Sequence, residues 1–87
     1  MSVVQLPSTL PPLFPGLPRR LELDAATVAG LIAELDRRYP GLADRLCERP
    51  DTLRPHIHVY VDQERATLTT ALTPDARVEV VAAISGG

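Results

Sequence analysis

The group that the sequence singles out for chemistry is the carboxylate of Gly87, which follows a second glycine, Gly86. At about 7% glycine usage, two terminal glycines occur by chance in roughly one chain in 200, and a frayed end is the plain alternative. A largely apolar segment, residues 78–84, precedes them, and the short end that follows it carries no charged side chain. Glycines enter narrow channels and accept backbone dihedral angles that are closed to other residues. We therefore expect Gly87 to react through its carboxylate and Gly86 to provide access.

The remaining candidates for chemistry are weaker. Cys47 is the only cysteine, and no histidine or basic cluster near it in the sequence indicates a lowered thiol pKa, so we expect a structural role. His56 and His58 share a face of an expected strand, but two ligands are too few for a zinc site. The sequence has no glycine-rich nucleotide loop. We expect no metal and no bound cofactor, and any ATP would be used by a partner enzyme.

Two groups of side chains are candidates for partner docking. Tyr60 follows His56 and His58 in an alternating segment, and with His58 it could form a docking patch, since tyrosine is favoured at interfaces. Leu13 and Phe14 belong to a proline-rich segment, 7–18, that also contains Leu10 and Leu17. These apolar residues could either pack against the sheet edge or contact a partner, and the sequence leaves both readings open.

Length and composition set the class of protein. Eighty-seven residues make one domain, residues 1–87, with a modest core. The net charge of −2 gives no electrostatic reason to expect nucleic acid or an anionic membrane as partner. All nine basic residues are arginine, so no lysine amine can act as a nucleophile. No apolar run approaches the ~20 residues of a membrane span, and no signal-peptide pattern begins the chain. We expect a cytoplasmic protein.

One amphipathic helix is the clearest predicted element. Its apolar residues follow the spacing i, i+3, i+4, i+7, i+11 on one face. They are Val28, Leu31, Ile32, Leu35 and Tyr39. Asp24 is the expected N-cap, and Pro40-Gly41 ends the helix. Residues 42–47 have the spacing of a short second helix.

Strands are predicted on both sides of this helix. Residues 3–6 and 19–23 precede it as a hairpin, and residues 57–61, 66–68 and 77–84 follow it, while 50–55 is expected to be irregular. One helix then covers one face of a mixed sheet of four to five strands, which gives an α+β two-layer domain. The simplest arrangement makes the first and last strands central neighbours, so that the C-terminus projects past the sheet.

At this point the sequence resembles the MoaD/ThiS family of ubiquitin-like sulfur carriers, which have the β-grasp fold. The resemblance covers nearly the whole chain, and its most specific part is the tail with the turn and strand before it. The matching segments are 27–35, 57–62, 72–78 and 83–87. Within the family, the proline-containing first loop, the passage 39–42 and the strand 59–62 look most like the CysO-type carriers of actinobacterial cysteine synthesis.

The resemblance implies a role for Gly87. A ubiquitin-activating-like adenylyltransferase would use ATP to adenylate the carboxylate, and sulfide or a persulfide would displace AMP to leave a thiocarboxylate. This would donate sulfur to a synthase in the biosynthesis of cysteine or another sulfur-containing metabolite, and a metalloprotease that releases product is a further implied partner. The chain would be a carrier and not an enzyme. Ala83, Ile84 and Ser85 would join the docking contacts, with residues 85–87 as a flexible tail.

Three alternatives remain open. The chain could be the small subunit of a molybdopterin synthase, although many of those proteins carry a short helical turn where this chain has its proline-rich loop. It could be a ubiquitin-like modifier that is joined to target proteins through Gly87. It could also be a β-grasp interaction module whose Gly86-Gly87 end has no chemical role.

Overall fold

A mixed five-stranded sheet forms one layer of the molecule. The computed structural model describes residues 1–83, and the strand order is β2-β1-β7-β5-β6. The strands are β1 (Ser2–Gln5), β2 (Arg20–Leu23), β5 (Ile57–Val61), β6 (Glu64–Ala66) and β7 (Arg77–Ala82). β1 and β7 are parallel neighbours near the centre, and the other pairs are antiparallel. The predicted pairing of the first and last strands is confirmed.

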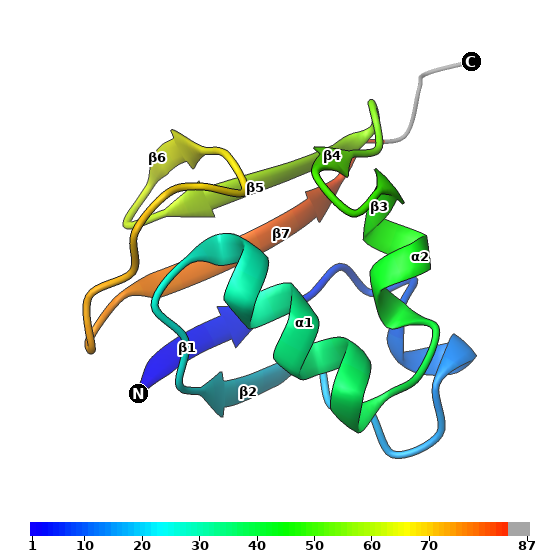
Figure 1. The fold of residues 1–87 in the computed structure, drawn as a ribbon. Helices are drawn as coiled ribbons and strands as arrows, with labels where there is room; N and C mark the ends of the chain where they lie inside the picture. Colours follow the sequence, from blue (N-terminus) through cyan, green and yellow to red (C-terminus); the bar gives the residue numbers. More distant parts are fainter. Residues whose placement is uncertain (84–87) are drawn as a thin grey trace.

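Helix α1 (Val28–Arg38) lies across one face of this sheet (Figure 1). The predicted apolar face is buried, with Leu31 and Leu35 fully inaccessible to solvent. Asp24 was expected to cap the helix, and this is wrong. The chain stays extended as far as Thr27, whose side-chain oxygen accepts a hydrogen bond from Gly30 N at 3.1 Å. A backbone hydrogen bond from Val28 N to Thr70 O further fixes the start of the helix at this point.

The core lies between α1 and the sheet, and its buried side chains form one cluster. Strand alternation sends one set of side chains into it. In β7, Val78 and Val80 are buried, whereas Glu79 and Val81 are exposed on the opposite face. The apolar residues that the composition offers, leucine, valine, isoleucine and alanine, therefore fill the core, and the face away from α1 stays open.

A short helix and a small hairpin follow α1. Helix α2 (Leu42–Leu46) begins after Gly41, which has a φ of +97°. It leads into a small hairpin of β3 (Cys47–Arg49) and β4 (Thr52–Leu53). The expected short helix is confirmed, but the expectation of an irregular segment over 50–55 is wrong in part, because the chain turns at residues 50–51 and pairs back on β3.

Two strand boundaries differ from the prediction. The return strand lies at Glu64–Ala66 rather than 66–68, because Asp62 and Gln63 alone make the turn, with φ values of 50° and 72°. A two-residue turn with both φ values positive matches the twist of a hairpin. β7 ends at Ala82, and Ile84, the predicted end, lies outside the described residues. Within residues 1–83, no helix is long and apolar enough to cross a membrane.

Candidate functional site

The strand that leads toward Gly86-Gly87 is held on both sides. β7 pairs with β1 on one edge and with β5 on the other, and both are long-range contacts within the central sheet. Beyond the strand, Ala83 N donates a hydrogen bond to His56 O at 2.7 Å. Ala83 is thus anchored beside the residues that precede β5. The other predicted tail residues, Ile84, Ser85, Gly86 and Gly87, lie outside the described part of the chain.

A row of polar side chains crosses the face of the sheet that α1 does not cover. We call this face, with Gln5, Arg20, His58, Tyr60, Arg65, Glu79 and Val81, the open face. Tyr60 lies opposite Glu79 on one side and Arg65 on the other. Gln5 continues the row, opposite both Glu79 and Arg20. Arginine therefore occupies both ends of the row and a carboxylate its middle, with a half-buried tyrosine between charges.

The part of the open face nearest the end of β7 is less polar. His58 lies opposite Val81, which is 39% exposed. The Nδ1 atom of His58 is buried and has no hydrogen-bond partner among residues 1–83. His58 and Tyr60, predicted together from their alternation, do share this face. The prediction missed Val81, although the same alternation in β7 was a sufficient signal for it.

Leu13 and Phe14, the other predicted docking residues, do not lie on the open face. The proline-rich segment forms a short 3-10 helix, η1 (Pro11–Leu13), in which Leu10 and Leu17 on either side are buried and Leu13 is 50% exposed. Leu13 and Phe14 line a shallow hollow of about 450 Å³ on the helix side of the molecule. The other lining residues are Pro40, Gly41, Asp44, Arg45 and Arg54. Both readings that the sequence left open therefore apply: Leu10 and Leu17 pack into the core, while Leu13 and Phe14 remain at the surface, where a partner could contact them.

We name the surface made by Leu13, Phe14, Pro40, Arg45 and Arg54 the proline-loop platform. It shares no residue with the open face. No sequence pattern predicted it, because three segments far apart in the chain meet there: the loop after β1, the start of α2 and the end of β4.

Cys47 is buried at the start of β3. Burial raises the pKa of its thiol above the ordinary value; the nearby Arg54 charge acts in the opposite direction and Asp44 adds to the increase. The thiol is therefore protonated at neutral pH and is a poor nucleophile, since the thiolate is the reactive form. Among residues 1–83, no three histidine, cysteine, aspartate or glutamate side chains gather in a way that could hold a metal ion.

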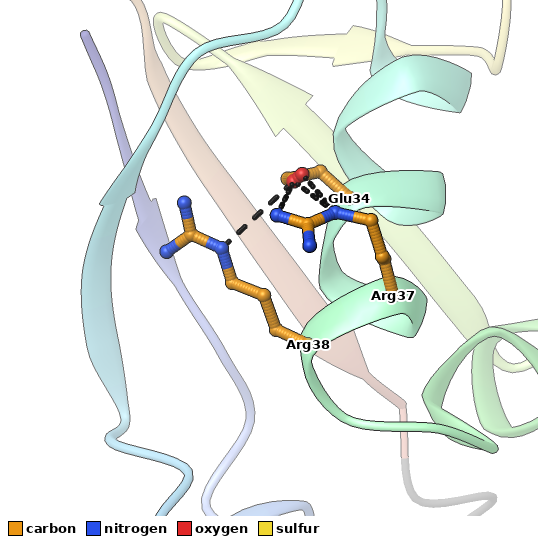
Figure 2. A network of polar contacts seen from close by, with 3 residues as sticks. All are labelled: Glu34, Arg37 and Arg38. Carbon is orange, nitrogen blue, oxygen red and sulfur yellow. Dashed lines mark hydrogen bonds and ion pairs between the residues drawn. The ribbon is translucent and has the colours of Figure 1, made fainter.

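The charged surface of α1 is paired within itself. Arg37 Nε donates to Glu34 Oε1 at 2.8 Å, and Arg38 Nε lies 3.9 Å from Glu34 Oε2 (Figure 2). The hydrogen bond from Arg37 is the main reason that the pKa of Glu34 is held below its ordinary value. These groups stabilise the end of the helix and line neither the hollow nor the open face.

Comparison with known families identifies the chain. The model of the ThiS family matches residues 13–87, which is most of the sequence. The chain belongs to the ThiS family. The match extends through β7 to Gly86-Gly87, whereas β1 and the first prolines of the loop lie before it. The resemblance inferred from the sequence is confirmed, and the protein is of the ubiquitin-like sulfur-carrier class.

Solved structures agree with this assignment and show the β-grasp fold. The CysO in the Amycolatopsis orientalis BexX/CysO complex is similar over 100% of both chains, with 25% identity and a TM-score of 0.87. CysO of Mycobacterium tuberculosis has 24% identity and a TM-score of 0.86, over 97% of this chain and 100% of that one. SAMP1 of Haloferax volcanii has 27% identity and a TM-score of 0.77, over 99% and 98%. No curated protein sequence matches the chain.

Proposed function

We propose that this chain carries sulfur as a thiocarboxylate on Gly87 and delivers it to a biosynthetic enzyme. The observation that supports this most strongly is the ThiS-family match, which runs through Gly86 and Gly87. A second support is the absence of another reactive group among residues 1–83: the Cys47 thiol is buried and protonated, and no metal-ligand cluster is present there. In this proposal Gly87 is the C-terminal residue of the working protein.

The chemistry needs two partner-catalysed steps. A carboxylate oxygen of Gly87 attacks the α-phosphorus of ATP, and pyrophosphate leaves with the electron pair of the broken P–O bond. Hydrosulfide then attacks the carbonyl carbon of the acyl adenylate, a C–S bond forms, and AMP leaves with the pair of the C–O bond. The resulting thiocarboxylate is the sulfur nucleophile. The carrier supplies the reacting atom, while the adenylyltransferase binds the ATP and the chain itself binds no cofactor.

The open face is the proposed contact for the adenylyltransferase. Near the end of β7 this face is formed by β5 and β7, and it offers Tyr60 and His58 beside the exposed Val81. Tyrosine supplies a large apolar area with a polar tip and is favoured at interfaces. Ala83, anchored to His56, marks the edge of this contact, and Ile84 and Ser85 would complete it inside the partner.

The acceptor is proposed by analogy. The similar CysO of A. orientalis was solved in complex with a protein called BexX, so a carrier of this shape can dock on a partner protein. We propose a sulfur-accepting synthase as the corresponding partner here, in cysteine or other sulfur-metabolite biosynthesis. A molybdopterin synthase large subunit is the alternative acceptor, and a product-releasing metalloprotease is a further proposed partner. With such partners, the proposal puts the working chain in the cytoplasm as well.

Intact-mass spectrometry tests the proposal. The chain is co-expressed with the ubiquitin-activating-like adenylyltransferase of its host and a sulfide source, and the expected product has one oxygen replaced by sulfur. A chain lacking Gly87 is the matched control and should stay unmodified. Only unmodified protein, from an adenylyltransferase that demonstrably releases pyrophosphate with this chain, would contradict the proposal.

A protein-modifier role is a second candidate. Its motivation is the similarity to SAMP1 of H. volcanii, a small archaeal modifier protein, at 27% identity. In this role the activated Gly87 would form an amide with a lysine of a target. This chain has no lysine, so it could not form chains with itself through side chains. Denaturing purification of a tagged chain from its host separates the roles: covalent adducts indicate a modifier, and free chain alone argues against one.

A further inference from the structure

We propose that the proline-loop platform is a second docking surface, and that its occupant is a segment of a partner protein in which an apolar side chain lies beside carboxylates. The inference does not depend on the sulfur chemistry, because it uses no atom of the tail. It rests on the shape, exposed apolar area and charge of the surface.

The platform has a fixed shape. Pro11 and Pro12 occupy η1, and their rings restrict the backbone before Leu13. Leu10 and Leu17 anchor the two sides of the turn in the core. Hydrogen bonds from Leu13 N to Leu10 O and from Leu17 N to Phe14 O close the loop on itself. Because the loop is already ordered, a partner that binds it loses little conformational entropy.

The apolar part is held open by the surrounding structure. Leu13 is one of the few large apolar side chains exposed among residues 1–83. A single exposed leucine is ordinary on a protein surface. Here, however, it borders the hollow of about 450 Å³ together with the half-buried Phe14 and with Pro40, while the rest of the lining is mostly polar. An apolar side chain of a partner would therefore contact these three residues directly beside charged groups.

The charge of the platform selects the partner. Two arginines, Arg45 and Arg54, and one aspartate, Asp44, line the hollow, which leaves an excess of one positive charge. Arg54 Nε donates to the backbone oxygen of Asp44 at 2.8 Å, which holds that side chain at the rim. Arg37 and Arg38 are already paired with Glu34 (Figure 2). Within residues 1–83, neither Arg45 nor Arg54 has an ion pair. Carboxylates are the complementary groups, and a basic segment would be repelled.

The platform also lies at the end of the molecule at which β7 ends. β1 and β7 are parallel, so β1 enters the proline loop at the same end of the sheet at which β7 ends (Figure 1). A protein that receives the end of β7 would therefore extend past the loop.

Peptide titration by NMR tests the inference directly. The probe is a capped decapeptide of aspartate, glutamate, leucine and phenylalanine, and the two controls replace either its acids by arginine or its apolar residues by serine. We expect the acidic apolar peptide alone to shift the amide signals of Leu13, Phe14 and Arg45. Equal binding of the basic peptide, shifts centred on Tyr60 and Val81, or no shift at millimolar peptide would overturn the proposal.

Matched substitutions then compare the two surfaces. Leu13→Ser and Arg45→Glu should each weaken peptide binding about three- to tenfold, the effect of losing a part-buried leucine or a surface ion pair. Val81→Ser and Arg65→Glu make the same changes on the open face and should leave peptide affinity unaltered. A chain truncated after Ser85 should bind the peptide as the full chain does. If it does not, the peptide binds the tail and the platform is not its site, whatever the fate of the thiocarboxylate.

Discussion

The open face and the proline-loop platform lie on opposite layers of the molecule and differ in how they are built. The open face is made by alternation along β5 and β7, whose inward side chains form the core. The platform is made by three separated segments that meet around Phe14. One surface is therefore a direct product of strand geometry, and the other depends on the packing of α1 and α2. This difference indicates which substitutions should affect both surfaces and which should affect only one.

Truncation of the shared core should have the largest effect. Leu31 of α1 is fully buried in the core, and Leu31→Ala should lower the free energy of unfolding by about 2–5 kcal/mol. This is a large share of the stability of a small domain, so both surfaces should lose their order together. Urea unfolding measures the loss. Leu13→Ala, at an exposed position, should change stability by less than about 0.5 kcal/mol, and a loss as large as that of Leu31→Ala would contradict the surface position of Leu13.

Substitutions on the open face should slow activation of the carrier. Tyr60→Ala should lower kcat/KM for pyrophosphate release by the adenylyltransferase about tenfold, mostly through KM, because an interface tyrosine is removed while the reacting carboxylate is untouched. Arg49→Ser on the β3–β4 hairpin is the control for a remote surface change. If Leu13→Ser slowed the same step as much as Tyr60→Ala, the two surfaces would act as one contact and the comparison would fail.

Substitutions at two glycines distinguish the surroundings of the platform from the rest of the helix layer. Gly41 has a φ of +97° at the start of α2, so Gly41→Ala should destabilise the protein by about 1–2 kcal/mol and shift the signals of the neighbouring Phe14. Gly30 has a helical backbone, and an added Cβ would meet only side-chain atoms at 3.4 Å or more. Gly30→Ala should therefore be neutral or stabilising by up to ~1 kcal/mol. Thermal unfolding checks both, and a reversed order would refute this account of α2.

The smallest predicted effect is the pH dependence that Glu34 contributes. Arg37 holds the pKa of Glu34 below that of the unfolded chain, so the stability from this pair is fully present above the unfolded pKa and is lost as the pH falls through the folded one. Glu34→Gln should flatten the acid side of a stability–pH curve slightly and leave both surfaces unchanged. Glu64→Gln is the control on β6. An unaltered acid slope in Glu34→Gln would show that the ion pair contributes nothing.

The two surfaces also mark how far the sequence alone could predict this protein. The period-2 pattern placed His58 and Tyr60 on one face, and the 3.6-residue period placed the buried face of α1. The same patterns predicted the neighbouring first and last strands. Local chemistry was less reliable where tertiary contacts competed: Thr27, and not Asp24, caps α1 because the backbone pairs with residues 70–72 up to that point.

The platform could not have been predicted in this way. Nothing in the local sequence of Arg45 or Arg54 indicates that they line the same hollow as Leu13. The loop after β1, helix α2 and the end of β4 come together there only in the folded chain. The prolines showed that the segment was neither helix nor central strand, but the division of its apolar residues between the core and the surface is decided by tertiary packing. Surfaces of this kind become visible only in the folded structure.

The central claim is that Gly87 carries the sulfur, and peptide mapping tests it most directly. After activation with isotopically labelled sulfide, cleavage at Arg77 releases the C-terminal peptide, residues 78–87, from the peptide that contains Cys47. The account predicts the label in the C-terminal peptide, on its final carboxyl group, and none on Cys47. Label on Cys47 with an unmodified C-terminal peptide would contradict it.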